Sequence, residues 1–539
     1  MAAFFATAQS DALVFRPAGD GEEAASPTDY KQETARRVYD LLVKARGDNR
    51  FNPPTFELVG TVSNGAKIIY PENRIILEEK AYDVCTQFGA DSINALATLL
   101  AHELIHFYEK HGWAGKFSSS FAGLGIGREI GKMSTKIINE TQADYLGGFL
   151  AYSAGYDVFG KGDEFMAALY HKYGLEDQID GYPSLSDRRA MSQSSAQRVN
   201  ELANVFDVAN LMAITAQSAE EYQAAQLLFE YILGDYQSRE LYNNLGVLAT
   251  YEALMYFNEN EVKYSYPLQL ELDFKSSRGS GFAEKREALL RKAVNYFDYA
   301  LGLDAGYAPA YLNKACALTL LKDYGRARFY AQTEALSKAG SADKHMAGSV
   351  EVLLGIIADA EGKADEAGKH FDNAIALGNP LGEYNKKILN GENSGREDNL
   401  GFSFGETEEI DGVDLITFTR QPKGKEIKPA LAIGPKVTLF QFLLEESPDN
   451  SKVMILQSSL ESSRGVMYLF QFTGKGFKGK TRKGITIGNS GRDEVEAMYG
   501  EPETSLLSTN GEIMKYKNIV FFLGPDKKVR KWVVMENTK

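Results

Sequence analysis

The chain has 539 residues, of which 44% are apolar and 24% are charged, close to the averages for soluble globular proteins. This length predicts several domains, each able to bury a core. The 59 basic and 73 acidic residues give a net charge of −14, which disfavours nucleic acid as a partner because phosphate binding relies on clustered positive charge. With only two cysteines, Cys85 and Cys316, a disulfide scaffold and a cysteine-rich metal site are excluded, and we interpret both as small buried apolar residues.

Residues 1–28 are predicted to be a leader with two open interpretations. No window of the sequence reaches the roughly 18 consecutive apolar residues that a membrane-spanning helix needs. The first ten residues, MAAFFATAQS, nevertheless contain a small-x-small triplet typical of a signal-peptidase site. Either the true start lies upstream and the exported protein is mature near Gln9, or this is an ordinary flexible terminus.

Helices and short strands alternate over residues 29–198. Helical patterns cover 29–46, about 91–111 and about 132–154, and strand-like runs within 55–80 (FELV, KIIY and RIIL) are separated by turn residues. The predicted helix over 91–111 carries the side chains that are able to take part in a chemical reaction.

That helix contains the motif HELIH, with histidine at positions 102 and 106. His102 and His106 are four residues apart and so share one helical face, where both imidazoles can bind one Zn²⁺ at about 2.0–2.1 Å. Glu103 lies beside them and can take a proton from a water held by the metal. The alternative is a helix with two surface or core histidines. The apolar run ALATLL before the motif disfavours it, because burying these groups without partners is costly.

A catalytic zinc site needs a third protein ligand, and the candidate lies 34 residues beyond His106 in the sequence NETQAD. Glu140 and Asp144 are again four apart on one helical face. Glu140 can ligate zinc, and Asp144 can accept the N–H of a ligating histidine. Two solvated acids are the alternative, which the largely apolar neighbouring sequence YLGGFL disfavours.

These motifs resemble the gluzincin peptidase family that includes the CAAX prenyl endopeptidases, HtpX and the Oma-type mitochondrial proteases. HELIH, then NETQAD, then AYSAGYD over 151–157 follow the order of that family's motifs, and His111 matches its further histidine. The resemblance covers about residues 30–195. It implies an α+β zincin-type metallopeptidase domain over 29–198.

A later motif of the family is matched in part. The family carries His-Pro and an arginine five residues after the proline; Arg188 fits this arginine, and Tyr182 replaces the histidine. The resemblance implies that Arg188, with Tyr182, stabilises a developing oxyanion or positions Asp144, since a phenol can also donate a hydrogen bond.

Residues 199–392 are almost wholly helical in pattern and are predicted to form tetratricopeptide-like repeats. The clearest unit opens with Leu354 and Gly355. It continues with Gly362, Ala367, Phe371 and Ala374, which lie 7, 5, 4 and 3 residues after the one before, and this spacing matches the tetratricopeptide pattern. A second unit has Phe297 between alanines at the same spacing, and a third opens at Tyr242. An insertion over about 258–283, rich in tyrosine and serine, interrupts the third unit. A simple bundle of helical hairpins is the alternative.

Residues 393–411 are acidic and contain glycine, which is typical of a linker. Residues 412–539 are predicted to be a C-terminal α+β domain, because runs rich in β-branched and aromatic residues alternate with turn residues. These runs cover 415–418, 437–440, 453–456, 466–472, 513–516 and 519–522. The end of this region weakly resembles the small lipoprotein fold of the outer-membrane assembly machinery; an unrelated α+β domain is the alternative.

The sequence thus predicts a multidomain zinc metalloendopeptidase that cleaves protein or peptide substrates, which would bind extended along an edge strand of the 55–80 region. A peptidase of this family followed by tetratricopeptide repeats is similar to the periplasmic proteases that enhance β-barrel assembly. This similarity implies a periplasmic or secreted location in the bacterial cell envelope, a role in protein quality control, and repeats that bind substrates or envelope assembly proteins.

The rival hypothesis is a non-proteolytic scaffold or chaperone of outer-membrane assembly with a structural or vestigial zinc site. Glu103 disfavours it, because a structural site needs no base.

Overall fold

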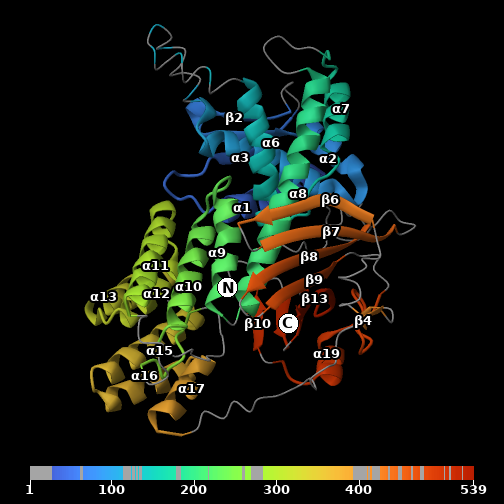
Figure 1. The fold of residues 1–539 in the computed structure, drawn as a ribbon. Helices are drawn as coiled ribbons and strands as arrows, with labels where there is room; N and C mark the ends of the chain where they lie inside the picture. Colours follow the sequence, from blue (N-terminus) through green and yellow to red (C-terminus); the bar gives the residue numbers. More distant parts are fainter. Residues whose placement is uncertain are drawn as a thin grey trace, which may run out of the picture. The chain divides into compact units, whose positions relative to one another are not determined.

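The structure is a computed structural model of a mostly helical chain (Figure 1). Its described residues divide into two compact units between Asn204 and Val205. The described residues are 27–60, 65–112, 136–177, 184–216, 218–257, 261–268, 283–340 and 342–392, single positions between 113 and 135, and, toward the C-terminus, 409–410, 413–414, 425–434, 437–446, 452–462, 465–473, 479–502, 504–508, 511–516, 518–524 and 526–538. The predicted leader lies outside them except for its last two residues.

The first unit combines helices with a small sheet. Its elements are α1 (Pro27–Arg46), β1 (Thr55–Val59), β2 (Ala66–Ile69), η1 (Tyr70–Glu72), β3 (Arg74–Glu78), α2 (Glu79–Cys85), η2 (Thr86–Asp91), α3 (Ser92–Tyr108), α6 (Lys136–Ser153), α7 (Gly162–Tyr173) and the start of α8 (Leu185–Thr215). The helices and strands predicted over 29–154 are therefore present, with ends that differ by a few residues.

The small sheet has the strand order β1-β3-β2, so β2 is an edge strand. β1 runs parallel to β3, whereas β2 is antiparallel to it, with Ile68 opposite Ile75. The central strand β3 is the most buried, because Ile75 and Leu77 are fully covered. This leaves one side of β2 free of strand partners among the described residues.

One continuous helix crosses the domain boundary that the sequence predicts at residues 198 and 199. α8 extends through both positions to Thr215, and the two compact units divide six residues later than predicted. The helical pattern carries no glycine or proline at this point that would end the helix.

In the helical part of the second unit, helices that follow one another in the chain pack together, such as α10 with α11 and α15 with α16. Its elements are α9 (Ala219–Leu233), α10 (Arg239–Leu254), α11 (Ala283–Leu303), α12 (Ala308–Leu320), α13 (Tyr324–Arg328), the π-helical turn η3 (Phe329–Ala335), α14 (Leu336–Ala339), α15 (Lys344–Ala360), α16 (Ala364–Ala376) and α17 (Pro380–Leu389).

The small and aromatic residues of the predicted repeats pack as pairs. A Cβ added at Gly246 would lie 2.5 Å from the Phe297 ring, and one added at Gly355 would lie 2.5 Å from the Phe371 ring. Both phenylalanines are fully buried. Glycine is therefore needed where each aromatic side chain meets the neighbouring helix, as expected for closely paired helices.

The C-terminal part of the second unit is built on an eight-stranded antiparallel sheet (orange to red in Figure 1). Its strand order is β10-β11-β12-β13-β9-β8-β7-β6. The elements of this part are β4 (Glu409–Ile410), β5 (Val413–Asp414), β6 (Lys425–Ile433), β7 (Val437–Glu446), β8 (Lys452–Ser462), β9 (Gly465–Thr473), α19 (Arg492–Tyr499), β10 (Thr504–Ser508), β11 (Gly511–Lys515), β12 (Ile519–Leu523) and β13 (Val529–Thr538).

Five of the predicted strand-like runs fall on β7, β8, β9, β11 and β12, and the run over 415–418 lies outside the described residues. β4, β5, β6, β10 and β13 were not predicted, and β4 lies within the predicted linker over 393–411. β13 joins the two halves of the sheet by pairing with β12 and β9. Across the described part of the chain, no helix is both long and apolar enough to cross a membrane.

Candidate metal centre

α3 is a buried helix that carries the HELIH motif into the interior of the first unit. Its side chains are covered on nearly all sides, as in Leu96, Leu100 and Leu104. A helix that is apolar around most of its circumference must be buried. His102 and Glu103 are therefore themselves buried, at 9% and 7% exposure. Ionisable groups in such a position need charged or hydrogen-bonding partners.

Three donor atoms from two helices converge to form a candidate metal site. The Nε2 atoms of His102 and His106 are 3.0 Å apart; on α6, Glu140 places Oε2 3.6 Å from Nε2 of His102 and Oε1 3.6 Å from Nε2 of His106. Tetrahedral coordination with bonds of about 2.0–2.1 Å requires donor–donor distances of about 3.3–3.4 Å. The three distances lie close to this value. Among the described residues, this is the one cluster of three His, Cys, Asp or Glu side chains with such convergence.

The other ring nitrogen of His102 has a fixed partner. Nδ1 of His102 lies 2.8 Å from Oδ1 of Asp144, one turn after Glu140 on α6. Burial alone would lower the pKa of His102, but the adjacent Asp144 and Glu140 carboxylates outweigh burial and raise this pKa to about 10. Nε2 of His102 faces the Glu140 carboxylate, 3.6 Å from Oε2, and a metal would bind there only to the neutral form of this ring.

His106 is held by a second histidine. Its Nδ1 lies 2.7 Å from Nδ1 of His111, whose Nε2 lies 3.1 Å from Oε1 of Gln142 on α6. Burial and the neighbouring His102 charge lower the pKa of His106 to about 3, so its ring is neutral, as a metal ligand must be. His111 reaches back because the chain turns just after α3, where Lys110 has a left-handed backbone with φ of 57°.

Glu103 lies beside the metal ligands but binds to the sheet. Its Oε2 accepts a hydrogen bond of 2.9 Å from the backbone N–H of Ile68 in the edge strand β2. Burial raises the pKa of the Glu103 carboxyl above its usual range, although the His102 charge opposes this rise. A carboxylate with a raised pKa is a stronger base than an exposed one.

Arg188, near the start of α8, connects the two acids of α6. Its Nη1 donates to Glu140 Oε2 at 2.5 Å, and its Nη2 lies 3.6 Å from Asp144 Oδ1. Burial alone would raise the pKa of Glu140, but the His102 hydrogen bond, together with the positive charges of His102 and Arg188, lowers this pKa well below its usual range. Glu140 is thus held as a carboxylate. Of the two roles expected for Arg188, these contacts fit positioning of the acids.

A cavity of about 550 Å³ opens next to the candidate site. Its lining includes the ligands, Glu103, Arg188 and residues 65–68 up to and along β2. Apolar residues of α7, of the segment before it and of α8 also line it. The apolar lining residues include Val158, Phe159, Phe165, Met166, Leu169 and Val199.

Two further residues of this region were not predicted from the sequence. The Tyr70 hydroxyl, just after β2, donates a 3.2 Å hydrogen bond to the His106 carbonyl oxygen. Burial raises the pKa of Tyr70 to about 12, so the phenol stays neutral. A Cβ at Gly112 would lie 2.6 Å from the Tyr70 ring, which explains glycine there. Tyr182, predicted near Arg188, lies outside the described residues.

Gly147 allows α6 to approach the ligand helix. A Cβ at this position would lie 2.8 Å from the His102 backbone nitrogen. We expect Gly147→Ala to separate α3 from α6, to destabilise the protein by about 1–3 kcal/mol and to weaken metal binding, because the two helices carry different ligands. Thermal melting and metal titration check this. Gly160→Ala is the control, since nothing lies within 4 Å of an added Cβ there. Unchanged metal binding by Gly147→Ala would contradict the prediction.

A scan of known protein families finds no family model that matches this chain, and a search of curated proteins finds no match.

Proposed function

We propose that the chain is a metal-dependent endopeptidase whose centre is formed by His102, His106 and Glu140. The observation that carries this proposal is the difference between two neighbouring acids. Glu140 converges with both imidazoles, whereas Glu103 lies beside them without joining the cluster and faces the cavity. A site with three protein ligands, an open side and an adjacent carboxylate is typical of metal-assisted hydrolysis. A purely structural site is closed and has no use for that carboxylate.

The donor set fits zinc. Two neutral imidazoles and one carboxylate match the ligands of known catalytic zinc sites, and each imidazole has a partner on its other nitrogen. When bound, zinc would polarise the carbonyl group of a substrate and lower the pKa of a water.

In this proposal the chain's own residues move the proton and hold the ligands. Glu103 accepts a proton from the attacking water and donates it to the leaving amine, as a buried carboxylate with a raised pKa can do in both directions. Asp144 and His111 fix the orientation of the two ligating rings. Arg188 keeps Glu140 ionised and in place.

Substrate binding is proposed along β2. The Ile68 N–H points away from β3 and toward Glu103, so the main-chain groups of this edge face the cavity. An extended peptide that adds to an edge strand gains main-chain hydrogen bonds that do not depend on its sequence. The apolar residues that line the cavity then contact one apolar side chain of the substrate.

We also propose which proteins the peptidase cleaves and where it acts. A peptidase linked to packed helical pairs suits unfolded proteins as substrates, since the helical pairs offer a second binding surface. The implied location in the bacterial cell envelope, with envelope assembly proteins as partners, rests on the sequence resemblance alone.

The direct test is cleavage of an unfolded, casein-like protein by the full chain. We expect cleavage by zinc-loaded protein, loss of cleavage after chelation, and recovery when zinc is returned, because the proposed reaction needs the metal. Fragment mass spectrometry should show cuts next to apolar residues. Cleavage that persists in thoroughly chelated protein would contradict a metal-dependent mechanism.

A further inference from the structure

A segment between α10 and α11 lies across helices that are distant in sequence. We call residues 261–268, with the sequence EVKYSYPL, the strap. The strap is neither helix nor strand, and it belongs to the insertion that separates α10 from α11. Its side chains and backbone contact α11, α15, α16 and α17 through the interactions described below. In a helical repeat, a connecting segment usually contacts only the neighbouring helices, so contacts with four helices are unusual.

The backbone of the strap is held by one buried side chain of α17. Asn385 is fully buried; its Oδ1 accepts from the Ser265 N–H at 2.9 Å, and its Nδ2 donates to the Ser265 carbonyl oxygen at 2.8 Å. One amide can satisfy both groups of a single residue only if they point to the same side, as they do in an extended chain. Asn385 therefore recognises extended backbone and not a particular side chain.

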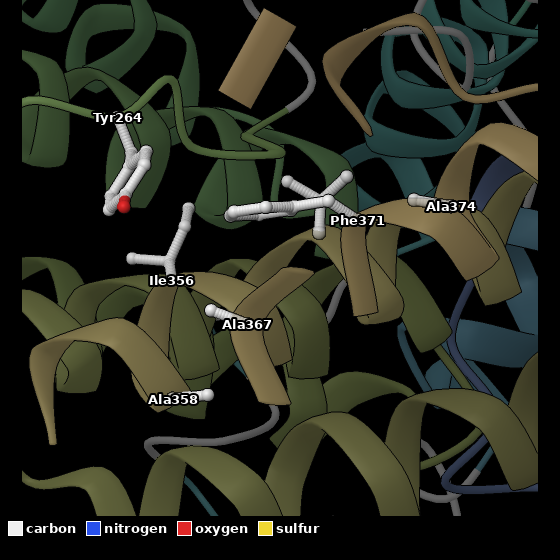
Figure 2. Packing of buried hydrophobic residues seen from close by; sticks show 7 residues of the cluster. Tyr264, Ile356, Ala358, Ala367, Phe371 and Ala374 are labelled. Atoms are coloured by element: carbon white, nitrogen blue, oxygen red, sulfur yellow. The ribbon is translucent and has the colours of Figure 1, made fainter. Parts of the chain in front are cut away.

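The residue before Ser265 provides an apolar anchor. Tyr264 is 6% exposed and packs into a cluster formed by α15 and α16. Figure 2 shows its ring beside Ile356 and Phe371, and the ring centroids of Tyr264 and Phe371 are 5.6 Å apart. An aromatic side chain held in this way contributes much of the binding energy of a peptide.

Charged groups fix the register of the strap. Lys263 Nζ forms a 2.7 Å ion pair with Asp359 of α15. Burial, and after it the same Asp359 carboxylate, raises the pKa of Tyr264. Glu261 forms two hydrogen bonds with Arg286 of α11, at 2.8 and 2.9 Å. Asp359 thus faces both Lys263 and the tyrosine that follows it, Tyr264.

The strap leaves space beside it. A cavity of about 440 Å³ is lined by the strap and by α11, α12 and α15. Its lining carries both signs of charge, including Arg291, Lys322 and Asp359. A ligand with longer side chains than the strap would find room there.

We infer that the helical pairs around Asn385 form a peptide-binding surface, that the strap is its internal ligand, and that an extended segment of another protein with a basic residue followed by tyrosine and a small residue binds there in its place. The backbone contact to Asn385 accepts any sequence, and the anchors at Tyr264 and Lys263 supply the selectivity. This surface is independent of the proposed peptidase activity.

A partner chain explains the arrangement better than a second copy of the same strap. A second copy would make only the contacts that the strap already makes within its own chain. A different polypeptide could fill the adjacent cavity as well. The tethered strap competes at an effective concentration of about 1 mM, so only partners that gain additional contacts displace it.

The test uses a fluorescein-labelled peptide with the sequence of residues 259–270, ENEVKYSYPLQL. Its binding is measured by fluorescence polarisation to the full-length wild type and to a full-length chain with residues 263–266 replaced by Gly-Ser-Gly-Ser. We expect at least about tenfold tighter apparent binding to the replaced chain, because the competing strap is gone. Tyr264→Ala serves as a second host if the replaced chain does not fold by circular dichroism.

Two further variants define the surface. Asn385→Ala in the strap-replaced chain should weaken peptide binding about tenfold or more, since two buried hydrogen bonds are lost. Asn390→Ala, at the exposed end of α17, is the matched control and should change nothing. Equal binding to wild type and replaced chain, no binding to either host, or no effect of Asn385→Ala would overturn the inference. Concentration-dependent dimers of the wild type that the peptide dissociates would assign the strap to a second copy and also overturn it.

Discussion

Glu103→Gln is expected to reduce peptide cleavage by about 10²–10⁴-fold while the protein keeps its metal and its fold. The variant removes the proton acceptor and keeps the size of the side chain. Glutamine retains an oxygen that can accept the Ile68 N–H hydrogen bond, and Glu103 does not belong to the ligand cluster. Because burial raises the pKa of Glu103, replacement by a neutral amide also removes an unfavourable buried charge. Initial cleavage rates and metal analysis of the same preparation measure both effects.

The same variant separates the peptidase from the scaffold hypothesis. Glu164→Gln, on the exposed surface of α7, is the matched control and should cleave like wild type. A scaffold would keep its biological effect in Glu103→Gln, whereas a peptidase would lose it. A Glu103→Gln variant that cleaves at more than a tenth of the wild-type rate would contradict the role proposed for this residue.

Glu140→Ala is expected to lose the metal and part of the protein's stability. The substitution removes one of three ligands and leaves the buried Arg188 guanidinium without its closest acceptor. Breaking a buried ion pair on one side costs about 3–5 kcal/mol, and the nearby Asp144 carboxylate would offset some of this. Equilibrium zinc titration and thermal melting measure the two losses.

Glu140→Gln distinguishes the loss of a ligand from the loss of the fold. Glutamine keeps the size of the side chain and an oxygen that can accept from Arg188, so we expect a folded protein with zinc affinity reduced at least about tenfold. Glu164→Ala should leave both affinity and melting unchanged. Zinc affinity equal to wild type in Glu140→Gln would show that the carboxylate is not a ligand.

Much of the metal centre could be predicted because it depends on local periodicity. His102 and His106, like Glu140 and Asp144, are pairs with a spacing of four, and any helix puts such pairs on one face. That the two faces meet required the tertiary structure. Gly147 makes this meeting possible, yet in the sequence a glycine within a helical pattern indicates only a local cost in stability.

Other parts of the site depend on contacts that the sequence pattern does not encode. The contact between His111 and His106 depends on the left-handed backbone at Lys110. A glycine there would have indicated such a turn in the sequence, but the residue is lysine. The hydrogen bond from Ile68 to Glu103 joins an edge strand to a helix 35 residues later. Spacing alone gives no register for such a pair.

The fold shows the same division between local and long-range features. Alternating apolar runs predicted several strands of the C-terminal sheet, but β6, with the sequence KEIKPALAI, contains a proline and two lysines and gives a weak strand signal. The insertion over 258–283 was recognised by its tyrosine and serine content. Its docking on Asn385, 120 positions after Ser265, could not be predicted from sequence spacing.

The central claim is that this chain holds one catalytic zinc ion between α3 and α6. The most direct measurement is the metal content of purified full-length protein by inductively coupled plasma mass spectrometry, with zinc uptake measured after chelation. We predict about one zinc per chain, recovered when zinc is returned at neutral pH. Protein that contains no zinc and takes up none at neutral pH, while folded, would contradict the metal centre and with it the proposed peptidase activity.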